Sequence, residues 1–256
     1  MPNGSTVIQL ERYDKKRARA EALRALTNAG RAATYPVEFC SQFGEDALVW
    51  TLLGGQLDGF FIEVGAFDGY RYSVTYALEC VGWRGLLIEA IPERAQECRH
   101  RRQHSRVVHA VLGEAGDGEA PFTVTDDEYG GMFSHTLENA GRQKKRPGTQ
   151  SRTVPVPMTT LDALLADHVG GVDAAAIDVE GGEMSVLRGF DLERHQPKVI
   201  LIEDNARGRD ATIADYMRGT PYVQVAWLKI NRVYVRNDLA AACAARLAEA
   251  VGDAAR

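Results

Sequence analysis

Two acidic residues stand at the ends of apolar stretches, where a carboxylate can meet a ligand. Glu63 lies in "FFIEVGAFDGY" and is followed by a turn with glycines at Gly65 and Gly69, and Glu89 ends the stretch "GLLIEA". Apolar runs of this length, bounded by turn residues, are typical of buried strands in a parallel sheet. Ligands of such sheets bind beyond the carboxyl ends of the strands. We therefore expect these acids and the glycine turn to border a nucleotide-type cofactor.

The spacing of the glycines limits which cofactor can bind. A dinucleotide fingerprint, G-x-G-x-x-G, needs its second glycine so that the backbone can approach a pyrophosphate, but Phe67 holds that position. No G-x-x-x-x-G-K-[ST] loop follows the strand either. S-adenosylmethionine has no phosphate, and it carries a positive sulfonium and an amino-acid tail. We predict this cofactor, with an NAD(P)-dependent oxidoreductase as the alternative.

Each predicted cofactor residue is assigned to one chemical group of S-adenosylmethionine. We expect Glu63 to meet its ammonium, directly or through water, and Glu89 to accept from the ribose hydroxyls. Backbone N–H groups from Gly65 to Tyr70, or the Ser73 hydroxyl, are expected to bind its carboxylate. The predicted set is Glu63, Gly65, Ala66, Gly69, Tyr70, Ser73 and Glu89.

A second group of polar side chains stands at the ends of two later apolar stretches. Asp178 and Glu180 lie at the end of "DAAAIDV", and Glu203, Asp204 and Asn205 at the end of "KVILIED". Carboxylates this close need a cation, a shared proton or basic neighbours. Oxygen ligands suit Mg²⁺ or Mn²⁺, and a metal-bound diol or catechol loses a proton more readily. The alternative is that these residues only cap the helices that follow them.

Methyl transfer to oxygen also needs a group that takes the proton of the acceptor. We predict Asp178 and His135 as the catalytic residues. His135 lies in "GGMFSHTLE", within a polar, glycine-bearing stretch at about 113–152 that is expected to form a lid-like insertion. An exposed loop histidine without a catalytic role is the alternative. Three side chains of the insertion are expected to cover the acceptor: Tyr129, Met132 and Phe133.

The elements that position these residues alternate along the chain. Strands are predicted at 60–64, 85–90, 106–112, 173–179 and 198–204, and helices at about 70–81, 92–103, 182–188 and 210–218. "YVQVAWLKI" and "NRVYVRN" predict an antiparallel pair near the C-terminus. The fold class is therefore α/β, with a doubly wound, mostly parallel sheet covered by helices on both faces.

Two segments of the chain are expected. Residues 1–40 form an N-terminal helical extension with a helix over 8–29, either solvated or a contact for a homo-oligomer. Residues 41–256 form the catalytic domain, whose first helix is expected to be capped by Ser41 or Asp46.

Composition excludes several classes of protein. The 256 residues are 45% hydrophobic and 25% charged, which is ordinary for a globular domain. A formal net charge of -5 argues against binding to nucleic acid through phosphate contacts. No apolar run reaches the roughly 18 residues of a membrane span, and the four cysteines form no CxxC pair. We expect a soluble, cytoplasmic protein that acts on a small molecule, without a membrane partner.

Several motifs together resemble a known family. "SQFGEDALV", "FIEVGAFDGY", "GWRGLLIEAIP", "VPMTTLDALL", "AIDVEGGEMSVLRGFD" and "PKVILIE" are similar to the FkbM-type S-adenosylmethionine-dependent methyltransferases, over residues of about 41 to 204. The resemblance implies a Rossmann-like class I methyltransferase fold and O-methylation of a hydroxyl, often on a sugar or other secondary metabolite. It also implies cofactor roles for Glu63, Gly65, Gly69 and Glu89, with Asp178 and Glu180 facing the site. A methyltransferase acting on nucleic acid or protein is a further alternative.

A narrower resemblance concerns the metal. "LIEDNA" resembles the strand end of the catechol O-methyltransferase group, which implies magnesium bound by Asp178, Asp204 and Asn205. Many FkbM-type sequences keep only the Glu at this strand end, so the Asp-Asn pair departs from the plainer pattern.

Overall fold

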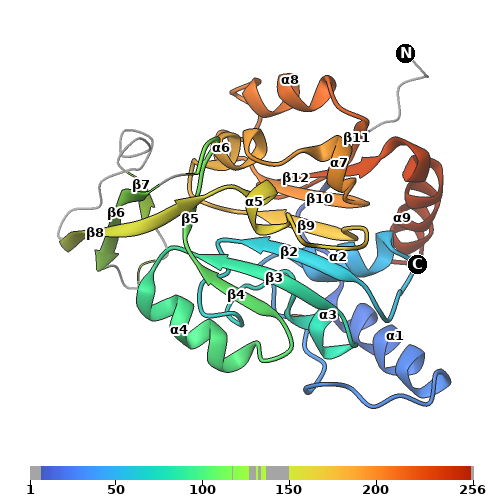
Figure 1. Ribbon diagram of the computed structural model, residues 1–256. Helices are drawn as coiled ribbons and strands as arrows, with labels where there is room; N and C mark the ends of the chain where they lie inside the picture. The colour runs from blue at the N-terminus through green and yellow to red at the C-terminus, as the bar shows by residue number, and fades with distance from the viewer. Residues whose placement is uncertain (1–6, 117, 127–130, 132–133, 137–149, 255–256) are drawn as a thin grey trace.

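The central sheet of the computed structural model has eight strands in the order β1-β11-β12-β10-β9-β2-β3-β4 (Figure 1). The structure describes residues 7–116, 118–126, 131, 134–136 and 150–254. Five neighbouring strands are parallel: β2 (Phe60–Val64), β3 (Arg84–Glu89), β4 (Arg106–His109), β9 (Ala174–Ile177) and β10 (Val199–Glu203). β12 (Asn231–Arg236) runs antiparallel to both β10 and β11 (Tyr222–Leu228). The predicted doubly wound sheet with an antiparallel C-terminal pair is confirmed.

Helices cover both faces of this sheet. One face packs against α1 (Lys15–Asn28), α2 (Glu45–Leu52), α3 (Tyr76–Cys80), α4 (Pro92–Arg101) and α9 (Ala240–Ala254), and the other against α5 (Leu161–Leu164), α6 (Glu183–Arg188), α7 (Leu192–His195) and α8 (Thr212–Arg218). Successive residues of β2 alternate between the two cores, with Phe61 in one and Ile62 in the other. The strands are apolar on both sides because both faces are buried.

The N-terminal segment differs from the expected helix over 8–29. Ile8–Leu10 forms a short edge strand, β1, which pairs in parallel with β11. α1 begins only after Asp14, whose side chain accepts from the backbone N–H groups of Lys16 and Arg17. The buried face of α1, with Ala18, Ala22 and Leu26, packs into the main core. This segment is thus built into the sheet rather than attached to it.

The predicted capping of the first helix of the domain is confirmed in part. Gly44, with φ +98°, precedes α2 and offers no side-chain cap. Ser41 Oγ accepts from Asp46 N at 3.3 Å and Asp46 Oδ1 accepts from Ala47 N at 2.8 Å, so both predicted residues bond to N–H groups in the first turn of α2.

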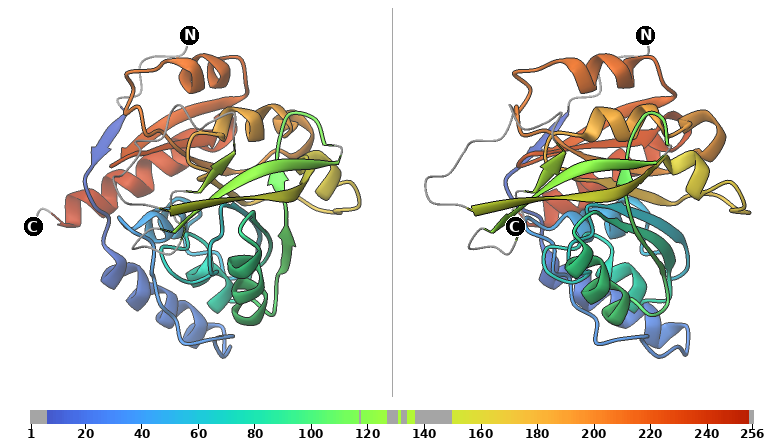
Figure 2. Two further views of the ribbon diagram at one scale, coloured as in Figure 1. Left: turned by 90° about the vertical axis from the view of Figure 1, so that its left-hand side faces the viewer. Right: turned by 60° about the vertical axis from the view of Figure 1, so that its left-hand side comes forward.

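A second, smaller sheet lies across the carboxyl ends of the parallel strands (Figure 2). Its order is β5-β8-β6-β7, formed by β5 (Val111–Leu112), β8 (Gln150–Thr159), β6 (Glu119–Asp126) and β7 (His135–Thr136). The strand expected over 106–112 is broken at Ala110, because β4 pairs with β3 while β5 pairs with β8. None of the helices within the described ranges has the length and apolarity needed to cross a membrane.

Candidate functional site

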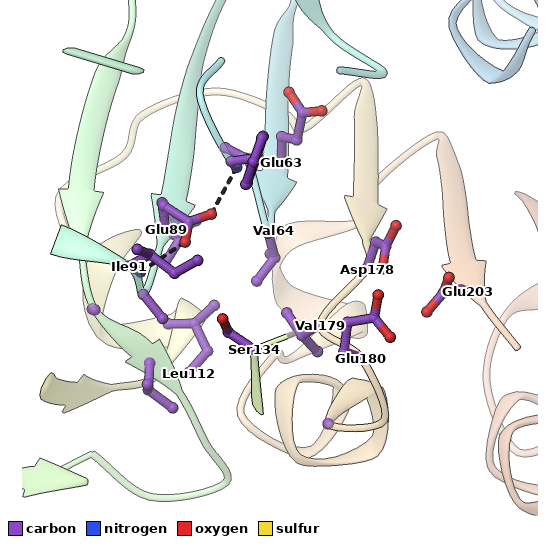
Figure 3. A pocket seen from close by; sticks show the side chains of 18 of the residues that line it. Glu63, Val64, Glu89, Ile91, Leu112, Ser134, Asp178, Val179, Glu180 and Glu203 are labelled. Carbon is purple, nitrogen blue, oxygen red and sulfur yellow. Dashed lines mark hydrogen bonds between the residues drawn. The ribbon is translucent and has the colours of Figure 1, made fainter. Parts of the chain in front are cut away.

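A cavity of about 870 Å³ opens between the two sheets, within the size range of small-molecule sites. It lies where the order of the parallel strands reverses, between β2 and β9, and its walls include Glu89 on one side and Asp178 on the other. The small sheet contributes apolar side chains, among them Leu112, Phe122 and Met158. Figure 3 shows Glu89, Ile91 and Leu112 on one side and Asp178, Glu180 and Glu203 on the other. The cavity therefore lies at the topological switch point of the sheet, and acidic side chains line both of its ends.

Both glycines of the first turn are required by the backbone. Gly65 has φ +85°, and a Cβ there would lie 1.8 Å from the carbonyl oxygen of Asp178. Gly69 has φ +77°, and its Cβ would lie 2.8 Å from Arg102 Cγ and Cys98 Sγ. The first glycine lets β2 approach the end of β9, and the second lets the loop approach α4. Gly65 and Ala66 line the cavity, whereas Gly69 and Tyr70 lie outside its lining.

The backbone donors of this turn already have partners inside the protein. Gly65 N and Ala66 N both donate to Ile88 O at 3.0 Å, and Gly69 N donates to Ala66 O at 2.9 Å. Tyr70 N donates to Asp68 Oδ1 at 2.9 Å, and the Tyr70 hydroxyl donates to Glu38. These groups were predicted to bind the cofactor carboxylate, and they could do so only by giving up these bonds.

Glu63 organises the loop that follows it. Its buried carboxylate accepts from the Ser73 hydroxyl at 2.8 Å, Val74 N at 2.7 Å and the Thr75 hydroxyl at 2.5 Å. Arg102 Nη1 lies 3.6 Å from the same carboxylate. These bonds hold residues 70–75 as an ordered loop and explain why α3 is shorter than the predicted helix over 70–81. Direct contact of Glu63 or Ser73 with a cofactor stays a prediction.

Glu89 is positioned as the sequence predicted, at the end of β3 and on the cavity wall. Its carboxylate accepts from Phe67 N and from Ile91 N, both at 2.7 Å, so it joins the loops after β2 and β3. Only 6% of the residue is exposed, and this burial raises the pKa of Glu89 to about 7. A carboxylate has about four acceptor positions, so Glu89 keeps the capacity to accept from a hydroxyl of a ligand.

Three carboxylates converge at the other end of the cavity. Oxygen atoms of Asp178, Glu180 and Glu203 lie within 4.8 Å of one another. Asp178 faces the open cavity while protein encloses its other sides, and this burial, reinforced by Glu180, raises the pKa of Asp178 to about 8. Burial and the charge of Asp178 likewise raise the pKa of Glu203. Asp178 and Glu203 are close enough to share a proton at neutral pH.

Two of the three residues predicted to bind a metal have other partners in the structure. Asp204 is buried and pairs with Arg232, with Oδ2 at 2.7 Å from Nε. Asn205 lines the cavity, but its Nδ2 donates to Glu203 Oε2 at 2.6 Å. Only Asp178 of the predicted set of Asp178, Asp204 and Asn205 belongs to the three-carboxylate cluster. The chain places Glu180 and Glu203 beside Asp178 instead.

Some predicted residues lie outside what the structure describes. The backbone of His135 belongs to β7, but its side chain is not described. Tyr129, Met132 and Phe133 also fall outside the described residues.

Three non-glycine residues of the cavity wall adopt positive φ: Phe67 at +50°, Tyr72 at +61° and Glu180 at +53°. Such conformations are uncommon for residues with a side chain and are frequent at functional sites. Glu180 was considered from the sequence because it belongs to the "DVEGGE" motif, whereas Tyr72 and Arg71 were not. No signal in the sequence identifies those two, because the loop that presents them was expected to be helical.

Comparison with known proteins identifies the family of the domain. The family described as "Methyltransferase FkbM domain" matches residues 63–220, more than half of the chain. The comparison with curated proteins gives no match. Likenesses of this chain to solved structures are distant. The N-terminal domain of human METTL16 has 13% identity and a TM-score of 0.42, over 87% of this chain and 81% of that chain.

A human methyltransferase 10 domain containing protein has 12% identity and a TM-score of 0.44, over 87% of this chain and 95% of that chain. The C-terminal domain of precorrin-6Y C5,15-methyltransferase from Rhodobacter capsulatus has 11% identity and a TM-score of 0.40, over 76% of this chain and 88% of that chain. Likenesses of this size carry no information about the substrate of this chain.

Proposed function

Because the chain belongs to the FkbM methyltransferase family, we propose that it is an S-adenosylmethionine-dependent O-methyltransferase acting on a hydroxyl of a small metabolite, such as a sugar-containing natural product. One observation carries this proposal. A single cavity joins a buried carboxylate, Glu89, to a cluster of three further carboxylates across the switch point of the sheet. The first end suits a ribose, and the second suits the removal of a proton from a hydroxyl.

The residues present fit S-adenosylmethionine. Glu89 offers acceptors for the vicinal hydroxyls of a ribose, and the apolar side chains of Ile91 and Leu112 stand beside it for an adenine ring (Figure 3). When bound, S-adenosylmethionine supplies a methyl group activated by a positive sulfur. The NAD(P) alternative is disfavoured, because Phe67 occupies the turn position where a dinucleotide site needs glycine.

We assign Asp178 as the group that takes the proton of the acceptor. It faces the open cavity, whereas Glu203 is buried behind it and holds Asn205. A general base works best when its pKa is near the operating pH, and the raised pKa of Asp178 meets this condition. His135 remains a second candidate for the same role.

The charge of the cavity favours a neutral, hydroxylated acceptor over a nucleic acid. Six acidic residues line the cavity: Glu63, Glu89, Glu114, Asp178, Glu180 and Glu203. Carboxylates at this density repel phosphates, which nucleic-acid enzymes bind with Lys and Arg.

A divalent cation, Mg²⁺ or Mn²⁺, is not needed for this proposal. Arg232 neutralises Asp204, and a shared proton between Asp178 and Glu203 relieves repulsion within the cluster.

An acceptor screen tests the proposed function. The protein is incubated with S-adenosylmethionine and a panel of sugars, polyols, catechols and glycosylated aromatics, and formation of S-adenosylhomocysteine is followed. We expect turnover with a hydroxylated acceptor and a product whose new methyl carbon has the chemical shift of an O–CH3 group. Methylation confined to RNA or protein substrates in a parallel panel would contradict the proposal.

A further inference from the structure

Arginine side chains are scarce on the wall of the cavity. Among the described residues that line it, the two with a permanent positive charge are Arg71 and Arg188. Arg188 lies 3.4 Å from Glu114, so it already has an acidic partner. Arg71 is exposed, and its guanidinium contacts the ring of Tyr72, with 5.8 Å from Cζ to the ring centroid. Arg71 is therefore the cavity cation with no carboxylate partner in the described part of the chain.

The amino-acid tail of S-adenosylmethionine ends in a carboxylate that needs donors in this acidic cavity. The turn after β2 is where such donors were expected, but its N–H groups at Gly65 and Ala66 are bonded to Ile88 O. The N–H group of Phe67 is bonded to Glu89, and the Ser73 hydroxyl to Glu63. A charged side chain from the same loop can supply the donors that these groups do not.

The backbone of Arg71 is held firmly in this loop. Arg71 N donates to Asp68 Oδ1 at 2.7 Å, and the other oxygen of Asp68 lies 2.7 Å from Arg101 Nη1. The next residue, Tyr72, forms a β-bridge with Ser41. The loop is thus tied to α4 on one side and to the start of the domain on the other, so Arg71 is presented from a fixed base.

We propose that the Arg71 guanidinium binds the carboxylate of the amino-acid tail of S-adenosylmethionine. The inference rests on the proposed function and adds a cofactor residue outside the set predicted from the sequence. A guanidinium suits this task because its planar N–H groups match a carboxylate with two parallel hydrogen bonds. The tail then runs from the ribose at Glu89 along the loop after β2.

Two ligands that differ in the tail test this proposal. S-adenosylhomocysteine carries the amino-acid tail, whereas 5′-methylthioadenosine lacks it and keeps the adenosine and the sulfur. Dissociation constants of both are measured by calorimetry for the full-length wild type, Arg71→Met, Arg71→Lys and Arg188→Met. We expect Arg71→Met to raise the dissociation constant of S-adenosylhomocysteine by about 10- to 100-fold, the usual effect of losing a charged hydrogen-bond pair. The affinity for 5′-methylthioadenosine should stay within about twofold.

The control variants separate a charge effect from a shape effect. Arg71→Lys keeps the charge but loses the planar guanidinium, so its affinity for S-adenosylhomocysteine should lie between those of the wild type and Arg71→Met. Arg188→Met removes an arginine that already has a partner, and it should leave both affinities unchanged.

Unchanged affinity of Arg71→Met for S-adenosylhomocysteine would overturn the proposal, even if the KM of an acidic acceptor rose, because the carboxylate recognised would then belong to the acceptor. Equal losses for both ligands would also overturn it, since they would report a distorted cavity. Failure of the wild type to bind either ligand would instead refute the proposed function itself.

Discussion

The buried carboxylate of Glu89 predicts a pH dependence of adenosine binding. Burial raises the pKa of Glu89 to about 7, so about 90% of it is ionised at pH 8 and about 10% at pH 6. Ribose hydroxyls donate to the ionised form, and protonation therefore competes with binding. The affinity for adenosine should therefore fall as the pH falls through 7. The ratio of the ionised fractions predicts an affinity about tenfold lower at pH 6 than at pH 8.

The best ligand for this measurement is 5′-methylthioadenosine, because it has no ammonium or carboxylate that titrates between these values. Calorimetric titrations at several pH values would give the dissociation constant of the wild type and of Glu89→Gln. The glutamine keeps the size of the side chain and one acceptor but cannot ionise. We expect weaker binding by Glu89→Gln at pH 8 and no pH dependence between pH 6 and 8. A flat profile for the wild type, or the same slope in both proteins, would refute the ribose role of Glu89.

Three further changes test other parts of the site. Asp178→Asn should lower kcat by about 10²- to 10⁴-fold, the usual contribution of a general base, with an unchanged dissociation constant for S-adenosylhomocysteine; an unaltered kcat would transfer the role to another residue. Turnover should survive exhaustive chelation, because Asp204 is paired with Arg232 and a proton shared by Asp178 and Glu203 relieves repulsion in the carboxylate cluster; loss of activity that Mg²⁺ or Mn²⁺ restores would show instead that this cluster binds a metal. Arg102→Met should lower the free energy of unfolding by about 3–5 kcal/mol, since Arg102 and Glu79 are fully buried partners at 2.9 Å. In urea unfolding, the exposed control Arg101→Met should change stability by no more than about 1 kcal/mol, and similar effects of the two variants would contradict this account.

The acidic residues at the strand ends could be predicted, because apolar runs in the sequence mark the strands and the order of the strands along the chain indicates a parallel sheet. Glu63, Glu89 and Asp178 each follow a run whose side chains fill both cores, and the parallel order brings such ends to one edge. Position alone does not give the direction of a side chain. Glu63 turns to Ser73 and Thr75 because Arg102, far along the chain, completes that network.

The partners of the predicted metal ligands could not be predicted for a related reason. Asp204 and Asn205 look equivalent in the sequence, yet the antiparallel strand β12 places Arg232 beside Asp204. A charged partner 28 positions away leaves no signal in the local pattern. The acid cluster that does form includes Glu180, whose left-handed backbone follows from the turn rather than from strand periodicity.

The small sheet was only partly predicted. β6 includes "APFTVT", where the residue types indicate a short strand within the expected insertion, but its partner β8 was not expected, because two prolines interrupt its pattern. Both prolines pair against β6 in the antiparallel register. β1 and β7, with three and two residues, were also missed, because they are too short to show a period.

A structure of the protein saturated with S-adenosylhomocysteine tests the central claim most directly. We predict that the ribose hydroxyls lie within hydrogen-bond distance of Glu89 and that the sulfur points across the cavity toward Asp178. Electron density for the ligand at any other place, or an unchanged cavity at saturating concentration, would contradict the assignment of this site.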